Sequence, residues 1–283
     1  RVRPVADQNN PFCESFYTFP GSAEKIRNIG RLNVVSTEGE RRRPSSLIHS
    51  QPYGSETLYN TLQEFFSVDF KDLDINNGAI NAITPADQYL MVFQNSKVSR
   101  VPVDRNILQT AAGQTSLSVS NLVLGSEQSF NGDYGVSTNQ SAVIDVDKTV
   151  YFIDKSRRAI IRIASDGFTP ISGSDISEKI EKTFIDTANL TKNYSLGYDR
   201  DTEHVYFTFQ PEGSFTGETY GYDNMKKTWV SRYNFFPLAY AKCENDMLSA
   251  HYTSSGWVHR HDDETARSNF YGTSKSCSVT MIS

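Results

Sequence analysis

The chain has 283 residues, a formal net charge of −5 and three cysteines. An acidic chain is a poor nonspecific binder of DNA, because neutralising phosphates requires clustered Lys and Arg. No stretch reaches the roughly 18 consecutive apolar residues of a membrane-spanning helix, and the odd, widely spaced Cys13, Cys243 and Cys277 favour reduced thiols made in a cytosol over a disulfide framework.

The ends of the chain suggest how it is divided. We expect residues 1–30 to be an N-terminal segment or a link to a missing part. Residues 31–283 are expected to form one propeller-like domain, incomplete as in a fragment of a longer chain, because the final "CSVTMIS" reads as a strand cut off in mid-pattern. Disordered or trimmed ends are the alternative.

Two short helices are expected. In residues 55–66, Leu58, Leu62, Phe65 and Phe66 can share one face of a helix. Residues 174–190 carry apolar residues at helical spacing, and Ser174 or Asp175 can cap the start of this helix.

Most of the remaining sequence predicts strand–turn–strand ribbons. The expected strand pairs are 88–94 with 98–103, 149–154 with 159–164, 204–209 with 218–223, and 246–253 with 257–262. They recur about every 40–60 residues, a spacing typical of propeller blades. One ribbon cannot bury both faces, whereas blades packed around an axis can. The predicted fold class is all-β: a β-propeller-like array of antiparallel blades with one or two short helices, in which residues 149–164 supply the inner two strands of one blade.

Large aromatic residues within these ribbons are the expected anchors of the core or of an interface. They are Phe152, Tyr206, Tyr222 and Trp229. Turns are expected at Asn77-Gly78, in the "IDVDK" stretch 144–148 and at residues 199–203, "DRDTE".

Signatures of catalysis are missing from the sequence. It contains no G-x-S-x-G, H-E-x-x-H, P-loop or G-x-G-x-x-G motif, and we predict no catalytic and no cofactor-binding residues. His259 and His261, which face the same way on a strand, are weak candidates for a metal site with the acidic residues 262–264; a solvated outer strand is the simpler interpretation.

The order of several motifs resembles a family. The stretches "TVYFIDKSRRAIIRIASDGF", "DISEKIEKTFID", "SLGYDRDTEHVYFTF" and "ETYGYDNMKKTWVSRYNF" are similar to the propeller-like part of the nozzle or muzzle proteins of short-tailed bacteriophages, also called tail tubular protein B, including those of crAss-like phages. Residues 31–54 are similar to an earlier blade of the same proteins.

The resemblance implies a structural, non-enzymatic role in the virion tail. Such proteins form a ring, usually sixfold, whose lumen passes DNA during ejection. The implied partners are other copies of the chain, adaptor or ring proteins, fibres and, transiently, viral DNA, with assembly in the host cytoplasm.

Two other functions remain open from the residues alone. One is a glycan-binding or glycan-cleaving propeller, which needs two facing carboxylates; Asp154, Asp199, Asp223 and Asp262 lie in the expected blade turns, but their spacing selects no pair. The other is a scaffold propeller that binds peptides.

Overall fold

The computed structural model describes residues 42–51, 61–66, 69–86, 89–109, 115–137, 142–173, 176–187, 194–251, 258–261 and 269–274. By its internal contacts the chain divides into a unit Arg1–Arg43 and a unit Pro44–Ser283. The boundary expected at residue 30 lies outside the described residues. Every described helix and strand belongs to the second unit.

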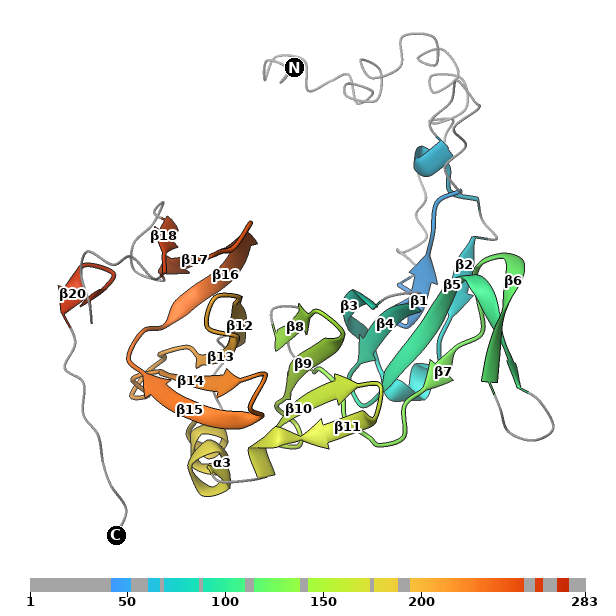
Figure 1. Ribbon diagram of the computed structural model, residues 1–283. Helices are drawn as coiled ribbons and strands as arrows, with labels where there is room; N and C mark the ends of the chain where they lie inside the picture. The colour runs from blue at the N-terminus through green and yellow to red at the C-terminus, as the bar shows by residue number, and fades with distance from the viewer. Residues whose placement is uncertain are drawn as a thin grey trace, which may run out of the picture. The chain divides into compact units, whose positions relative to one another are not determined.

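Four larger antiparallel sheets follow one another along the chain (Figure 1). The first contains β3 (Ile80–Ala86), β4 (Tyr89–Gln94), β5 (Val98–Gln109) and β6 (Thr115–Leu124), with β7 (Gln128–Ser129) also paired to β5. The second contains β8 (Val143–Val146), β9 (Thr149–Asp154), β10 (Ala159–Ala164) and β11 (Gly167–Pro170). The third contains β12 (Tyr194–Asp199), β13 (His204–Phe209), β14 (Glu218–Asp223) and β15 (Thr228–Tyr233), and the fourth β16 (Pro237–Cys243), β17 (Asp246–His251) and β18 (Val258–Arg260).

Smaller elements complete the described part. Two short ribbons pair β1 (Ser46–Ile48) with β2 (Phe70–Asp72) and β19 (Asn269–Phe270) with β20 (Thr273–Ser274). The helical elements are α3 (Ser177–Asp186) and the 3-10 turns η2 (Thr61–Gln63), η3 (Ile75–Asn77) and η5 (Ile171–Gly173). In the described ranges, no helix is long and apolar enough to cross a membrane.

The all-β prediction is confirmed, and so are the ribbons. The strands expected at 149–154, 159–164, 204–209 and 218–223 have those bounds in the structure, as β9, β10, β13 and β14. In the fourth ribbon β17 ends at His251 and β18 begins at Val258, and the residues between them lie outside the described part. Residues 149–164 are the middle pair of the second sheet, flanked by β8 and β11.

The helix expected over residues 55–66 is wrong in the part that the structure describes. Leu62, Phe65 and Phe66 are 49%, 55% and 54% exposed, and only the η2 turn is helical there. The physical reason is a competing pairing: the Gln51 amide donates to the Glu64 carbonyl (3.1 Å) and the His49 amide to the Asp69 carbonyl (3.0 Å), which holds this segment beside β1.

The cap expected for α3 also differs from the structure. Its N-cap is Ile176, which makes no side-chain cap hydrogen bond, while Ser174 and Asp175 lie outside the described residues. Packing on the third sheet supports the helix, since Ile180 and Phe184 are buried and the Phe184 ring lies 5.3 Å from that of Phe209.

The first strands of the four sheets lie next to one another in chain order. β3 contacts β8, β8 contacts β12, and β12 contacts β16. One buried apolar cluster includes residues of the first three sheets. This succession is what a series of propeller blades would have along its axis, although the propeller interpretation itself stays a prediction.

Candidate functional site

Three buried aspartates end strands and hold the turns that follow them. The Asp154 carboxylate accepts the backbone amide of Arg157 at 3.0 Å. Asp199 accepts the amide of Asp201 at 3.0 Å, and Asp223 accepts that of Lys226 at 2.8 Å. Each turn ends in a residue with positive φ, namely Arg158, Glu203 or Lys227.

This arrangement corrects the hypothesis that these carboxylates converge on a substrate. Asp154, Asp199 and Asp223 are at most 4% exposed, and their oxygens are occupied by donors of their own turns, so they are turn caps. Asp154 also accepts the backbone amide of Gly135 at 3.0 Å, which ties its turn to the segment after β7. Asp262 lies outside the described residues. A local signal existed in the sequence, because an aspartate followed by a turn commonly accepts the amide two or three residues later.

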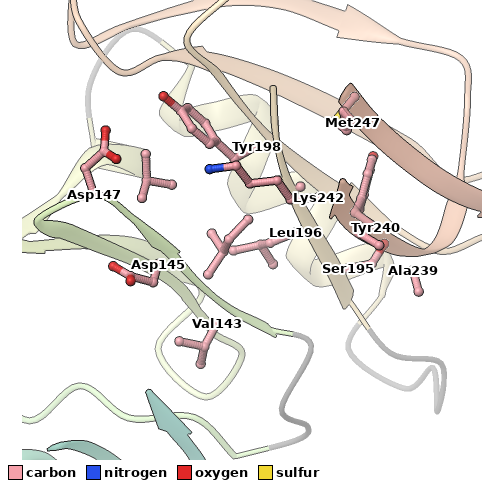
Figure 2. Close-up of a pocket in the computed structure, with 14 residues that line it drawn as sticks. Val143, Asp145, Asp147, Ser195, Leu196, Tyr198, Ala239, Tyr240, Lys242 and Met247 are labelled. Atoms are coloured by element: carbon pink, nitrogen blue, oxygen red, sulfur yellow. The ribbon is translucent and has the colours of Figure 1, made fainter. Parts of the chain in front are cut away.

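A pocket of about 320 Å³ opens between the first strands of three sheets. Its lining comes mainly from β8, β12 and β16, with Met247 of β17 (Figure 2). Val143, Leu196 and Ala239 make parts of it apolar, and Asp145, Asp147 and Lys242 bring charges into it.

Burial shapes the electrostatics of this pocket. It raises the pKa of Asp145, and the charge of Asp147 adds to that effect. Burial also raises the pKa of the Tyr198 phenol, whose hydroxyl donates to the Glu203 carboxylate at 2.5 Å. Ser195 is already engaged, since its hydroxyl donates to the Pro237 carbonyl at 2.7 Å, and it is therefore no free nucleophile. The pocket can hold a small polar group, but it presents no activated nucleophile among its described lining residues.

The sequence did not reveal this pocket. The turn expected over residues 144–148 is confirmed only at Asp147 and Lys148, where Asp147 has a positive φ, because Ile144, Asp145 and Val146 belong to β8. Tyr198 and Lys242 enter through strands of other sheets. The contacts are distant in sequence, so no local motif marks them.

The two candidate metal ligands lie in a cluster of aromatic and histidine side chains. His259 and His261 share one face as their spacing predicts, with ring centroids 4.8 and 6.4 Å from that of Tyr271. The Ser249 hydroxyl lies 2.6 Å from His261 Nε2 and 2.7 Å from the Tyr271 hydroxyl. Burial lowers the pKa of His261 to about 4, so this ring is neutral at pH 7.

The described part of the chain supplies no third ligand for a metal ion at His259 and His261. No group of three or more His, Cys, Asp or Glu residues there could hold a metal ion, and residues 262–264 lie outside it. His259 and His261 therefore stay weak candidates, and the predicted absence of a metal site stays a prediction.

The four predicted anchors all lie in or against apolar clusters. Phe152 is fully buried, and Tyr222 and Tyr206 are 3% and 7% exposed. Trp229 is partly buried; its ring lies 5.1 Å from that of Tyr222, and its indole nitrogen donates to the Ile171 carbonyl at 3.0 Å. This last bond joins the third sheet to η5, directly after the second sheet.

Comparisons with known proteins place the chain in a family. A family model described as Crassvirus muzzle protein matches residues 32–252. Among solved structures, a Bacteroides fragilis protein described as a putative 6-phosphogluconolactonase is similar with 11% identity and a TM-score of 0.34, over 65% of this chain and 54% of that one. This chain thus spans about half the length of that structure, and a likeness at this level carries no functional argument. The comparison with curated proteins finds no match.

Proposed function

The chain belongs to the crassvirus muzzle protein family, and on that premise we propose that it is a wall element of the conduit through which DNA leaves the virion. As a muzzle protein it is a structural component of a phage tail. In more detail, we propose that several copies surround a lumen, six if the resemblance holds, and that their rigid packing keeps this lumen open for DNA. The observation that carries this proposal is the family match over residues 32–252.

The structure supports a mechanical role through its packing. The Phe93 and Phe152 rings, from the first and second sheets, lie 5.3 Å apart, and the Tyr151 and Phe207 rings, from the second and third, lie 6.1 Å apart. Edge-to-face aromatic contacts of this kind add to apolar burial and fix the orientation of each ring. Sheets joined in this way resist displacement, as a wall element must.

The charge of the chain is consistent with a conduit. At −5 it offers little nonspecific attraction for phosphate, so DNA would slide past it and not be retained. The glycosidase alternative loses support, because three of its four candidate carboxylates cap turns.

Two measurements on purified virions test the proposal. Mass spectrometry should detect the chain, and cryo-electron microscopy should place several copies around a lumen at the tail. Absence of the chain from the virion, or single copies away from the tail axis, would contradict the proposal. A hydrolase activity toward glycans that survives purification would favour the alternative.

A further inference from the structure

A second pocket, of about 460 Å³, opens between the first and second sheets. One side comes from Arg100 of β5 and from β7 with the two residues after it, and the other from residues 165–168 at the β10–β11 turn. Its volume falls in the range of about 300–1,000 Å³ that is usual for small-molecule sites. It shares no lining residue with the pocket between β8, β12 and β16, and the conduit role makes no use of it.

The Arg100 guanidinium in this pocket is held by three contacts. It lies over the Tyr89 ring at 5.1 Å from the centroid and over the Phe130 ring at 5.7 Å, where the faces of the rings attract a cation. Its Nε donates to the Gln128 side-chain oxygen at 2.7 Å. These contacts occupy the guanidinium faces and Nε, so the two terminal nitrogens remain to bind a carboxylate through two parallel hydrogen bonds.

Arg100 is partly buried, yet it has no acidic partner among the described residues. Four other arginines each lie within 3.5 Å of a carboxylate oxygen: Arg157, Arg162, Arg232 and Arg260. Charged groups that proteins cover are usually paired. A guanidinium that is fixed in place without a carboxylate therefore points to an anionic ligand.

The remaining lining combines aromatic rings with polar groups. The Phe130 and Phe168 rings are partly buried, with centroids 5.3 Å apart. Gly132 lets the segment after β7 approach the second ring, since a Cβ there would come within 3.0 Å of Phe168. The exposed side chains of Asn131 and Ser165 add an amide and a hydroxyl. A sugar matches such a mixture, because its ring carries C–H groups beside hydroxyl groups.

Asp166 in the same lining distinguishes among anions. Its side chain is 61% exposed and pairs with Arg162 at 3.5 Å, which leaves carboxylate lone pairs for further hydrogen bonds. A carboxylate accepts hydrogen bonds from hydroxyl groups, whereas it repels an anion that has no donor to offer. One fixed cation and one carboxylate in a single pocket thus match a ligand with one acidic group and several hydroxyls.

We propose that this pocket binds a sugar acid, that is, a sugar ring that carries a carboxylate. The carboxylate of the ligand pairs with Arg100, its hydroxyls donate to Asp166, and the C–H groups of its ring lie against Phe130 or Phe168. The ligand is either a free sugar acid or one residue of an acidic polysaccharide. This binding activity is separate from the conduit and does not rest on it.

Calorimetric titration of the full chain tests the ligand class. The probes are methyl glucuronide, galacturonate and N-acetylneuraminate, with methyl glucoside as the neutral control and acetate as the anion without a sugar ring. At least one sugar acid should bind at least about tenfold more tightly than both controls, because the charge-assisted pair and the ring contacts act together. An oligogalacturonide distinguishes the sources: binding at least as tight as that of galacturonate indicates a polysaccharide, and exclusion indicates the free sugar acid.

Arg100→Lys tests the proposed contact, because lysine keeps the charge but lacks the planar fork. It should weaken binding of the sugar acid at least about tenfold, with unchanged circular dichroism. Arg200→Lys, at an exposed position in the turn after β12, is the matched control and should bind as the wild type does.

Amide exchange in the wild type locates the site without any substitution. Bound sugar acid should slow exchange at residues 128–131 and 165–168. Three results would each overturn the inference: sugar acids that bind no better than methyl glucoside, a folded Arg100→Lys that binds as tightly as the wild type, or protection confined to other residues. Each of them would leave the proposed function intact, since copies around a lumen do not require this pocket.

Discussion

At the scale of single residues, the buried aspartates are the most consequential polar groups in the described part. The Asp154 carboxylate accepts hydrogen bonds from the backbone amides of Arg157 and Gly135. It also forms an ion pair with the Arg157 guanidinium, at 3.4 Å. Removing the carboxylate leaves the buried Gly135 amide without an acceptor, at about 1–3 kcal/mol, and also removes the part-buried bond to the Arg157 amide. We expect Asp154→Ala to lower the free energy of unfolding by about 2–4 kcal/mol, measured by urea denaturation.

The matched control for that substitution is Asp201→Ala. Asp201 occupies an exposed position in the equivalent turn after Asp199, so its replacement should change stability by less than about 0.5 kcal/mol. Equal urea midpoints for Asp154→Ala and the wild type would show that the cap contributes nothing.

His261 makes stability depend on pH. Burial lowers its pKa to about 4, against the smaller opposing effect of Asp199, while the charge of His259 lowers it further. An unfolded histidine has a pKa of about 6.5, so between pH 6.5 and 4 the unfolded chain binds a proton that the folded chain refuses. Stability therefore falls as pH falls through this range, by roughly 2 kcal/mol at pH 5.

Denaturation curves at pH 7.5 and 5.0 check this, with His261→Gln as the comparison because glutamine can still bond to Ser249 but does not titrate. The wild type should lose roughly 2 kcal/mol more than the variant over that interval. Parallel losses in the two proteins would mean that groups other than His261 account for the pH dependence.

At the scale of elements, the close approach of β12 and β16 depends on a glycine. A Cβ at Gly197 would lie 2.4 Å from the Tyr240 ring, near its attachment to the side chain, so the ring or the strand must move. Overpacking of this kind costs about 1–3 kcal/mol. We expect Gly197→Ala to destabilise the protein by that amount in urea titrations and to speed amide exchange in β16 and β17.

Gly173→Ala is the control, since nothing lies within 4 Å of a Cβ there and its φ is ordinary. It should leave both measurements unchanged. A neutral Gly197→Ala would show that the fourth sheet tolerates displacement from the third.

The sequence predicts the middle strands of the sheets better than the first ones. β9 and β13 are runs of aromatic and β-branched residues that are almost wholly buried, and such runs identify strands without further context. β8 is only four residues long, and β12 contains Gly197, so the sequence indicates these strands mainly through the turns beside them. The pocket consists of these first strands, which is why it could not be predicted. The helix prediction for residues 61–66 is wrong for a similar reason, since long-range hydrogen bonds with His49 and Gln51, just after β1, outweigh helical periodicity.

At the scale of the whole described part, stability is distributed unevenly along the chain. One large cluster spans the first three sheets, whereas the fourth sheet rests on a small one whose buried members are Tyr206, Phe235 and Met247. Local opening needs less free energy where fewer apolar groups are buried. In dilute solution, amides of β17 should therefore exchange with an opening free energy at least about 2 kcal/mol below those of β9 and β13. Uniform protection in dilute solution would mean that the four sheets unfold as one unit.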